Sequence, residues 1–158
     1  MDADLFRTVM GHFVSGVTVV TGRKGSGDPF GLTASSFTSV SLDPLLVLVS
    51  VGQGSATLPR LVEAGSFAIN ILSAGQEEIA YRFAGSDRGG RFQELDWRPG
   101  EATGSPILGG ALAWMECSLW RCVTAGDHEL VLGEVLGAAP SEGDPMVYFR
   151  GGFHRLAP

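Results

Sequence analysis

Residues 30–51 read FGLTASSFTSVSLDPLLVLVSV, and this stretch decides the fold class. Phe30 to Ser41 is rich in Thr, Ser, Val and Phe, a composition that favours a strand, and Asp43-Pro44 breaks it. The run Leu45 to Val51, apolar at every position except Ser50, is long enough for a buried strand. Two strand signals joined by a short turn predict a β-hairpin.

The rest of the chain continues this pattern. Five more strands are expected, at Val17–Arg23, Phe67–Leu72, Ala111–Thr124, Glu129–Ala138 and Met146–Leu156. A helix is expected over Asp2–Phe13 and is ended by Gly16, because helical spacing is shown by Leu5, Phe6, Val9, Met10 and Phe13. Two more helices are expected, from Ser55 or Thr57 to about Ala64 and from a capping box at Ser73 and Gln76 to about Phe83. Residues 85–110 read as a loop anchored by Phe92, Leu95 and Trp97. About seven strands with short glycine-bearing turns predict a mainly β, antiparallel barrel that forms one domain over residues 1–158.

Composition and charge exclude several function classes. The net charge is −6 and Lys24 is the only lysine, which argues against a nucleic-acid partner. The apolar run Phe13–Val20 is interrupted by Ser15, Gly16 and Thr18 and is too short to span a membrane, so a cytoplasmic location is expected. Cys117 and Cys122 lie five residues apart, without a CxxC pattern or companion histidines, so we expect reduced thiols and no metal site.

Three segments carry candidate chemistry. Six of the nine residues from Thr33 to Ser41 bear hydroxyls, which must face water, backbone or a ligand. Ser50–Thr57 places glycines after a strand and before a helix, an arrangement suited to a phosphate but equally an ordinary connection. His128 lies in a Gly-Asp-His-Glu turn, either solvated or at a ligand. No GxSxG elbow accompanies them, and hydride transfer needs none, because the cofactors carry that chemistry.

Together, and in this order, the segments resemble the short-chain flavin reductases, the reductase partners of two-component flavin monooxygenases. The likeness covers nearly the whole chain, and GLTASSF combined with GDH and GEV is specific. The matching segments are Gly31–Phe37, Ser39–Ser41, Asp43-Pro44, Phe67–Leu72, Phe83–Gly85, Gly104–Pro106, Glu116-Cys117, Gly126–His128, Gly133–Val135 and Val147–Phe153.

The resemblance implies an FMN-binding split barrel, a Greek-key antiparallel barrel with a few short flanking helices, usually a homodimer with flavin sites near the subunit interface. It implies that the flavin, FMN or FAD, is lined by Thr33, Ala34, Ser35 and Ser36, with its phosphate end near Ser50, Gly54, Ser55 and Thr57. His128 would position the nicotinamide of NADH or NADPH, and Phe153 would help shape that pocket.

The implied activity is hydride transfer from nicotinamide C4 to flavin N5, after which reduced flavin diffuses to a partner monooxygenase. Family members often carry a basic or amide side chain in the loop that here reads Gly52-Gln53-Gly54, and only Gln53 takes that part. Two alternatives stay open. One is an oxidase of the pyridoxamine-phosphate oxidase type, whose basic phosphate ligands this chain is poor in. The other is a non-catalytic flavin- or haem-binding module, for which His128 alone is thin support.

Overall fold

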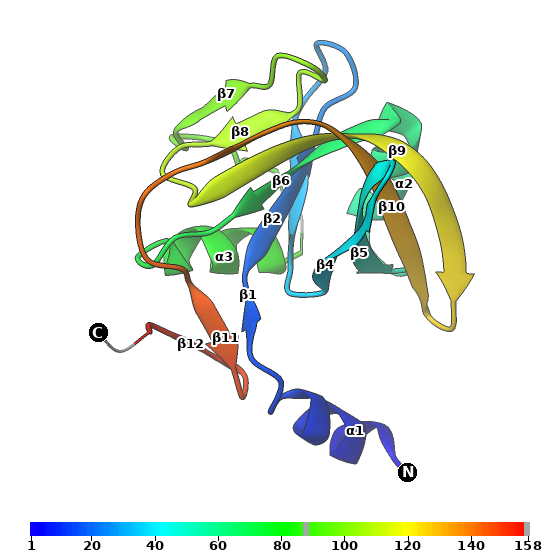
Figure 1. Ribbon diagram of the computed structural model, residues 1–158, viewed down its shortest axis with the longest axis vertical. Coiled ribbons are helices and arrows are strands. Elements are labelled where there is room, and N and C mark those ends of the chain that lie inside the picture. Colours follow the sequence, from blue (N-terminus) through cyan, green and yellow to red (C-terminus); the bar gives the residue numbers. More distant parts are fainter. Residues whose placement is uncertain (87–88, 157–158) are drawn as a thin grey trace.

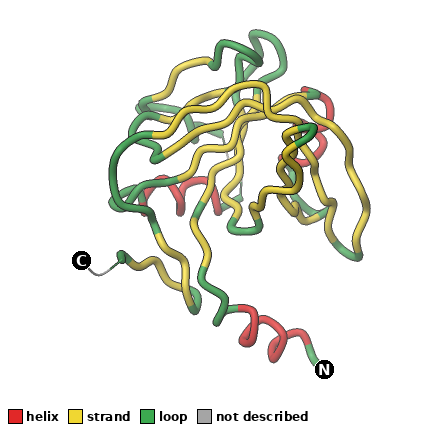
Figure 2. Tube along the Cα trace, viewed as in Figure 1, coloured by secondary structure: helices red, strands yellow, loops and turns green. Residues whose placement is uncertain are grey.

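The computed structural model describes residues 1–86 and 89–156, and the chain is built around one seven-stranded sheet (Figure 1). The strands follow the order β3-β2-β6-β9-β10-β5-β4, and every neighbouring pair is antiparallel. Their bounds are β2 Thr18–Gly22, β3 Phe30–Ala34, β4 Phe37–Leu42, β5 Leu45–Gly52, β6 Ser66–Ile71, β9 Ala113–Ala125 and β10 His128–Pro140. Strands and loops dominate the trace (Figure 2), which confirms the expected mainly β, antiparallel fold.

The main core lies on the concave face of this sheet. Alternate residues of β5 point into it, so Val47, Val49 and Val51 are buried while Leu46 and Leu48 are only partly covered. Phe67 of β6 and Val131 of β10 belong to the same cluster. The apolar run of β5 is therefore buried on one face only, and its second face remains partly open.

The stretch Phe30–Ser41, expected to be one continuous strand, is divided in two. β3 pairs with β2 at one edge of the sheet, and β4 pairs with β5 at the other edge. The connecting residues Ser35 and Ser36 cross the seam between these edges and, among the described residues, take part in no ladder pair. The single-strand prediction is wrong because the first half of the segment pairs with β2 at one edge of the sheet and the second half pairs with β5 at the other edge.

Two small sheets complete the fold. β1 (Ser15–Gly16), β11 (Val147–Phe149) and β12 (Gly152–His154) form one, and β7 (Trp97–Pro99) pairs with β8 (Pro106–Leu108) in the other. The prediction of a single strand over Met146–Leu156 is wrong, because Arg150 at φ 49° and Gly151 at φ 79° reverse the chain. The expected loop 85–110 contains β7 and β8, although its predicted anchors Phe92, Leu95 and Trp97 do pack onto a second core cluster.

The three expected helices are present as α1 (Ala3–Met10), α2 (Thr57–Ala64) and α3 (Glu77–Ala84). The Asp2 carboxylate accepts the Leu5 N–H at 2.8 Å and caps α1, which ends at Gly11 rather than Gly16. Half of the predicted capping box forms before α3: Gln76 Oε1 accepts the Ser73 N–H at 3.0 Å. No helix in residues 1–86 or 89–156 has the length and apolar character needed to cross a membrane.

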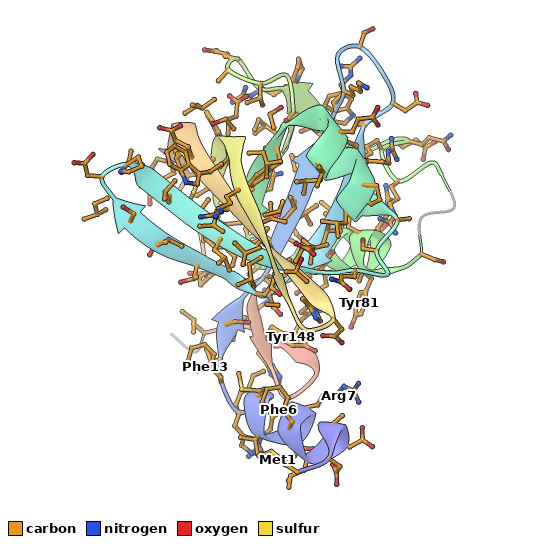
Figure 3. The ribbon with its side chains drawn as sticks, turned by 90° about the vertical axis from the view of Figure 1, so that its right-hand side faces the viewer. Met1, Phe6, Arg7, Phe13, Tyr81 and Tyr148 are labelled. Carbon is orange, nitrogen blue, oxygen red and sulfur yellow. The ribbon has the colours of Figure 1, made fainter. Side chains whose placement is uncertain are left out.

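α1 stands apart from the barrel (Figures 1 and 3) and has no buried residue. The residues that predicted its apolar face are exposed instead: Leu5, Phe6, Val9 and Met10 lie on it and Phe13 follows it, with exposed fractions from 50% to 74%. The amphipathic pattern correctly predicted the helix, but no described residue of the same chain covers its apolar side.

Two buried polar side chains tie the loop 95–110 to the barrel. The Glu116 carboxylate of β9 accepts hydrogen bonds from Thr103 N and Thr103 Oγ1, both at 2.8 Å, and from Ala102 N at 3.2 Å. The Asn70 amide of β6 accepts the Leu108 N–H at 2.8 Å and donates to the Val19 carbonyl at 3.2 Å. Both groups are satisfied, mainly by backbone, and burial of a polar side chain requires such partners.

Candidate active site

A groove of about 1030 Å³ opens beside the seam of the barrel. The Ser35–Phe37 segment forms one wall, and α1 with its following turn forms another, where Figure 3 shows Phe6, Arg7 and Phe13. Tyr148 and the Arg150-Gly151 turn of the small sheet complete it. The groove therefore collects three parts of the chain that are distant in sequence.

The charge of this groove is opposite to that of the whole chain. Its lining includes the cations Arg7 and Arg150 and, among the described residues, no carboxylate. Arg7 pairs with Asp4 at 2.8 Å on the solvent side of α1. Because nearby cations attract anions even when the net charge is −6, an anionic nucleotide meets a locally favourable surface here.

The hydroxyl-rich segment divides into anchored and open groups. Thr33 Oγ1 donates to the Ala80 carbonyl of α3 at 2.7 Å, and Ala34 is buried. Ser36 Oγ donates to the Ser50 carbonyl at 2.9 Å and accepts the Ser50 N–H at 3.1 Å. Ser35 is exposed on the groove wall. The structure thus brings Ser36 and Ser50 together and turns the Thr33 hydroxyl towards the protein.

The glycine turn after β5 lies at the same end of the sheet. Ser55 Oγ accepts the Thr57 N–H at 3.2 Å, so it closes the first turn before α2. Thr57 is buried, and its hydroxyl donates to the Gly31 carbonyl at 3.4 Å. Gln53 Nε2 donates to Glu129 Oε1 at 3.2 Å. Gly54 is exposed, and a Cβ placed on it would meet no atom within 4 Å, so a ligand can approach its backbone.

His128 begins β10 and is paired directly with Gly52 of that turn. Its Nδ1 lies 2.7 Å from Asp127 Oδ1. The pKa of Asp127 is lowered, first by this hydrogen bond, then by the charge of His128 and a backbone hydrogen bond, and to a smaller extent by Arg7. Asp127 is therefore ionised at neutral pH, and the tip of the β9–β10 hairpin lies within electrostatic reach of the cation on α1.

Phe153 lies elsewhere in the chain. Its ring packs against Tyr81 at 4.9 Å and Tyr148 at 5.8 Å between centroids, within the second core cluster. In Figure 1, β12 and the tip of the β9–β10 hairpin lie on opposite sides of the molecule. Within one chain the structure brings Thr33–Ser36, Ser50–Thr57 and His128 together. Phe153 lies apart from His128, but it packs against Tyr148, which lines the groove together with Ser35 and Ser36.

Residues 10–157 match the model of the flavin reductase like domain. The chain belongs to this family. Among its curated relatives, the NADH-dependent FAD reductase of Streptomyces globisporus is 44% identical over 156 residues, which cover 96% of this chain and 85% of that protein. An NADH-dependent FMN reductase of Agrobacterium fabrum is also 44% identical, with the same coverage of both chains.

Solved flavin reductases share the architecture. The Streptomyces globisporus NADH:FAD oxidoreductase, in complex with NAD and FAD fragments, superposes with a TM-score of 0.93 at 44% identity, covering 99% of this chain and 94% of that one. The flavin reductase component of a bacterial two-component tryptophan halogenase gives a TM-score of 0.91 at 42% identity, covering 99% of each chain. The expected split-barrel fold is confirmed by these neighbours.

The groove fits the nucleotides that such flavin reductases use. Open backbone donors at Ser35 and Ser36 suit the carbonyl and nitrogen rim of a flavin ring, and the cations suit phosphates. Sequence reasoning missed Arg7 and Arg150 as residues of this region, and it included Asp127 only as part of the Gly-Asp-His-Glu turn. Arg7 reads as the polar face of a helix and Arg150 as a turn residue, and no spacing signal links two positions so far apart.

Proposed function

We propose that this chain is an NADH-dependent flavin reductase that supplies reduced FMN or FAD to a partner monooxygenase. The observation that carries the proposal is the open seam of the barrel, where Ser35 and Ser36 face a groove whose lining is cationic on an otherwise acidic chain. The Acinetobacter baylyi reductase component of a flavin-dependent trigonelline monooxygenase, 40% identical over 147 residues, supports the assignment of such a partner.

When both nucleotides are bound, the reduced nicotinamide supplies a hydride and the flavin accepts it. The protein's part is to hold and orient the two rings. The N–H groups of Ser35 and Ser36 and the Ser35 hydroxyl bind the polar rim of the flavin, while Thr33, Ala34 and Ser36 fix the shape of that wall through their contacts with α3 and β5. Fixed donors stabilise negative charge that develops on the flavin ring.

The phosphate end of the flavin is assigned to the glycine turn. Gly54 leaves the backbone accessible, and Ser50, Ser55 and Thr57 shape the approach to α2, whose N-terminus favours an anion. Gln53 belongs to this turn as well, and its side chain is directed to Glu129.

The test follows NADH absorbance with and without added FMN or FAD. Loss of NADH that depends on added flavin supports the reductase. Amine-dependent oxygen uptake without NADH would instead identify an oxidase, and a yellow protein inert towards NADH and NADPH would identify a binding module. Comparing NADH with NADPH and FMN with FAD settles both nucleotide preferences.

The role of His128 is tested by His128→Ala. Its ring lies beside the glycine turn, so the variant is expected to raise the KM for NADH about tenfold while flavin affinity changes less than twofold. Flavin affinity is measured by fluorescence quenching. Equal loss of NADH use and flavin affinity would contradict a role on the nicotinamide side.

We also infer a homodimer whose interface covers α1. Leu5, Phe6, Val9 and Met10 leave one side of α1 apolar and exposed, a feature that commonly marks an interaction surface, and Phe153 lies away from His128 within one chain. A second copy would bury α1 and bring Phe153 of one chain towards the site of the other. Sedimentation equilibrium tests this: Phe6→Asp should shift the wild-type dimer to monomer, whereas Arg98→Gln, at an exposed residue of β7, should not, and a monomeric wild type would overturn the inference.

A further inference from the structure

Gln53 is bonded to the chain on both sides of His128. Its backbone N–H donates to the Asp127 carbonyl at 2.9 Å, and its side-chain Nε2 donates to Glu129 Oε1 at 3.2 Å. Glu129 is itself held by Thr124, whose Oγ1 donates to the same carboxylate oxygen at 2.6 Å. One residue of the glycine turn therefore joins both neighbours of the histidine at the tip of the β9–β10 hairpin.

The strand register explains why these groups meet. β5 ends at Gly52 and β10 begins at His128, and the antiparallel pairing sets these two residues opposite each other. A Cβ on Gly52 would lie 3.9 Å from His128 Nε2, so the imidazole lies against the turn. The residue after Gly52 is then the one whose side chain can reach past the histidine to β10.

The two ring nitrogens of His128 have different surroundings. Nδ1 faces Asp127 Oδ1 at 2.7 Å, and an ionised carboxylate only accepts hydrogen bonds, so Nδ1 carries the proton of this contact. Nε2 is directed to the turn that Gln53 occupies. The charged groups around the ring are Asp127 and Glu129 on its own hairpin and, at longer range, Arg7 of α1.

We propose that Gln53 is a positioning residue, which clamps the His128 tip to the glycine turn through Glu129, rather than a ligand of the flavin phosphate. This inference rests on the proposed function, since it links the turn assigned to the flavin phosphate with the histidine assigned to the nicotinamide. Its consequence is that loss of the Gln53 side chain affects the nicotinamide side of the site more than the flavin side.

A negative charge introduced at position 53, followed by an exchange of the side chains at positions 53 and 129, separates the two roles. Gln53→Glu sets two carboxylates against each other and is expected to raise the KM for NADH about fivefold, the size of a lost hydrogen bond plus a like-charge contact at an exposed site. The double variant Gln53→Glu with Glu129→Gln restores a donor and an acceptor with their direction reversed, so the KM should return to within twofold of wild type. Gln93→Glu, an exposed glutamine outside the groove, is the charge-matched control and should leave the KM unchanged.

A phosphate ligand predicts different results for the same proteins. Gln53→Glu would then weaken FMN far more than riboflavin, which lacks the phosphate, and the exchange at position 129 would rescue nothing. That outcome overturns the clamp. So does failure of the double variant to restore the KM while all variants keep the wild-type melting temperature.

A readout without substrate keeps this test separate from the proposed function. The imidazole nitrogen resonances of His128, followed by NMR in the flavin-free protein, should shift in Gln53→Glu and return in the double variant. If the wild type shows no flavin-dependent loss of NADH, the proposed function fails and these resonances still decide the clamp. Unchanged resonances in Gln53→Glu would overturn it.

Discussion

At the scale of single residues, burial decides what each polar group does. Glu116 has the chemistry of a catalytic acid or base, yet it is 2% exposed and its carboxylate is filled by donors from Ala102 and Thr103. Glu116 lies on β9, and its hydrogen bonds hold the turn between β7 and β8 in place. Gly100 belongs to this arrangement, because a Cβ there would overlap the carboxylate.

Glu116→Gln is expected to lower the free energy of unfolding by about 2 kcal/mol, because the amide nitrogen would face an N–H donor and leave it unsatisfied. Urea unfolding followed by circular dichroism measures the change. Glu101→Gln, an exposed carboxylate in the same turn, is the matched control and should stay within about 0.5 kcal/mol of wild type. Equal stability of the two variants would show that the buried contacts contribute nothing.

The two thiols, Cys117 and Cys122, also differ in burial. Burial, and then the charge of Glu116, raises the pKa of Cys117 to about 12, while Cys122 is half-buried and its pKa is also raised, chiefly by burial. A thiol reagent at pH 8 should therefore label one cysteine per native chain, slowly, and both after unfolding. Cys122→Ser should abolish native labelling. Because the folded state of Cys117 holds its proton more tightly, the stability linked to it is complete below pH 9.0 and declines as the pH rises towards 12.

At the scale of elements, the sequence predicted types better than connections. The amphipathic spacing of Leu5, Phe6 and Val9 predicted α1, and the run of apolar residues predicted β5, in which every second residue is buried. The break at Ser35-Ser36 was not predictable, because no glycine or proline marks it and the hydroxyl pattern continues through it. That break is imposed by the sheet order, which only long-range pairing determines. β11 and β12 were merged for a similar reason, although Gly151 was a signal for their turn.

The paired strands β9 and β10 depend on a close approach at Gly133. A Cβ there would lie 2.8 Å from Cys117 Cβ and would overlap the Phe67 ring, both in the main core. The register also shifts between Leu132 and Gly133. Gly133→Ala is expected to destabilise the protein by about 2–3 kcal/mol through overpacking, measured by thermal and urea unfolding. Gly137→Ala, where a Cβ would meet no atom within 4 Å, is the control on the same strand.

At the scale of the whole molecule, charge is distributed unevenly. The chain carries −6 overall, while the groove beside the barrel opening is lined by Arg7 and Arg150. The composition gives the net charge but not the cationic lining of the groove, because the residues of that lining come from segments near both ends of the chain. The sequence motifs placed the candidate site on Thr33–Ser36, Ser50–Thr57 and His128, and the fold brings these together. Arg7 and Arg150 are brought to the groove by tertiary contacts, which no local sequence pattern predicts.

Arg150→Gln is expected to raise the KM for NADH about three- to tenfold at low ionic strength and by less than twofold in 0.5 M salt, because screening removes most of the attraction between exposed charges. Steady-state kinetics across a salt series measures this. Arg98→Gln removes an exposed cation outside the groove and serves as the control. An effect of Arg150→Gln that does not depend on salt would indicate a packing role instead.

The distal half of β9 has a further consequence. β6 pairs with β9 only as far as Ser118, so from Trp120 to Ala125 the strand has, among the described residues, β10 as its single bonded neighbour. A free strand border of this kind is a template on which another chain can nucleate a fibre. Arg121 is exposed in the middle of that border, between Trp120 and Val123, and its charge opposes such stacking. The solubility of this protein at high concentration therefore depends on a residue that has no part in its chemistry.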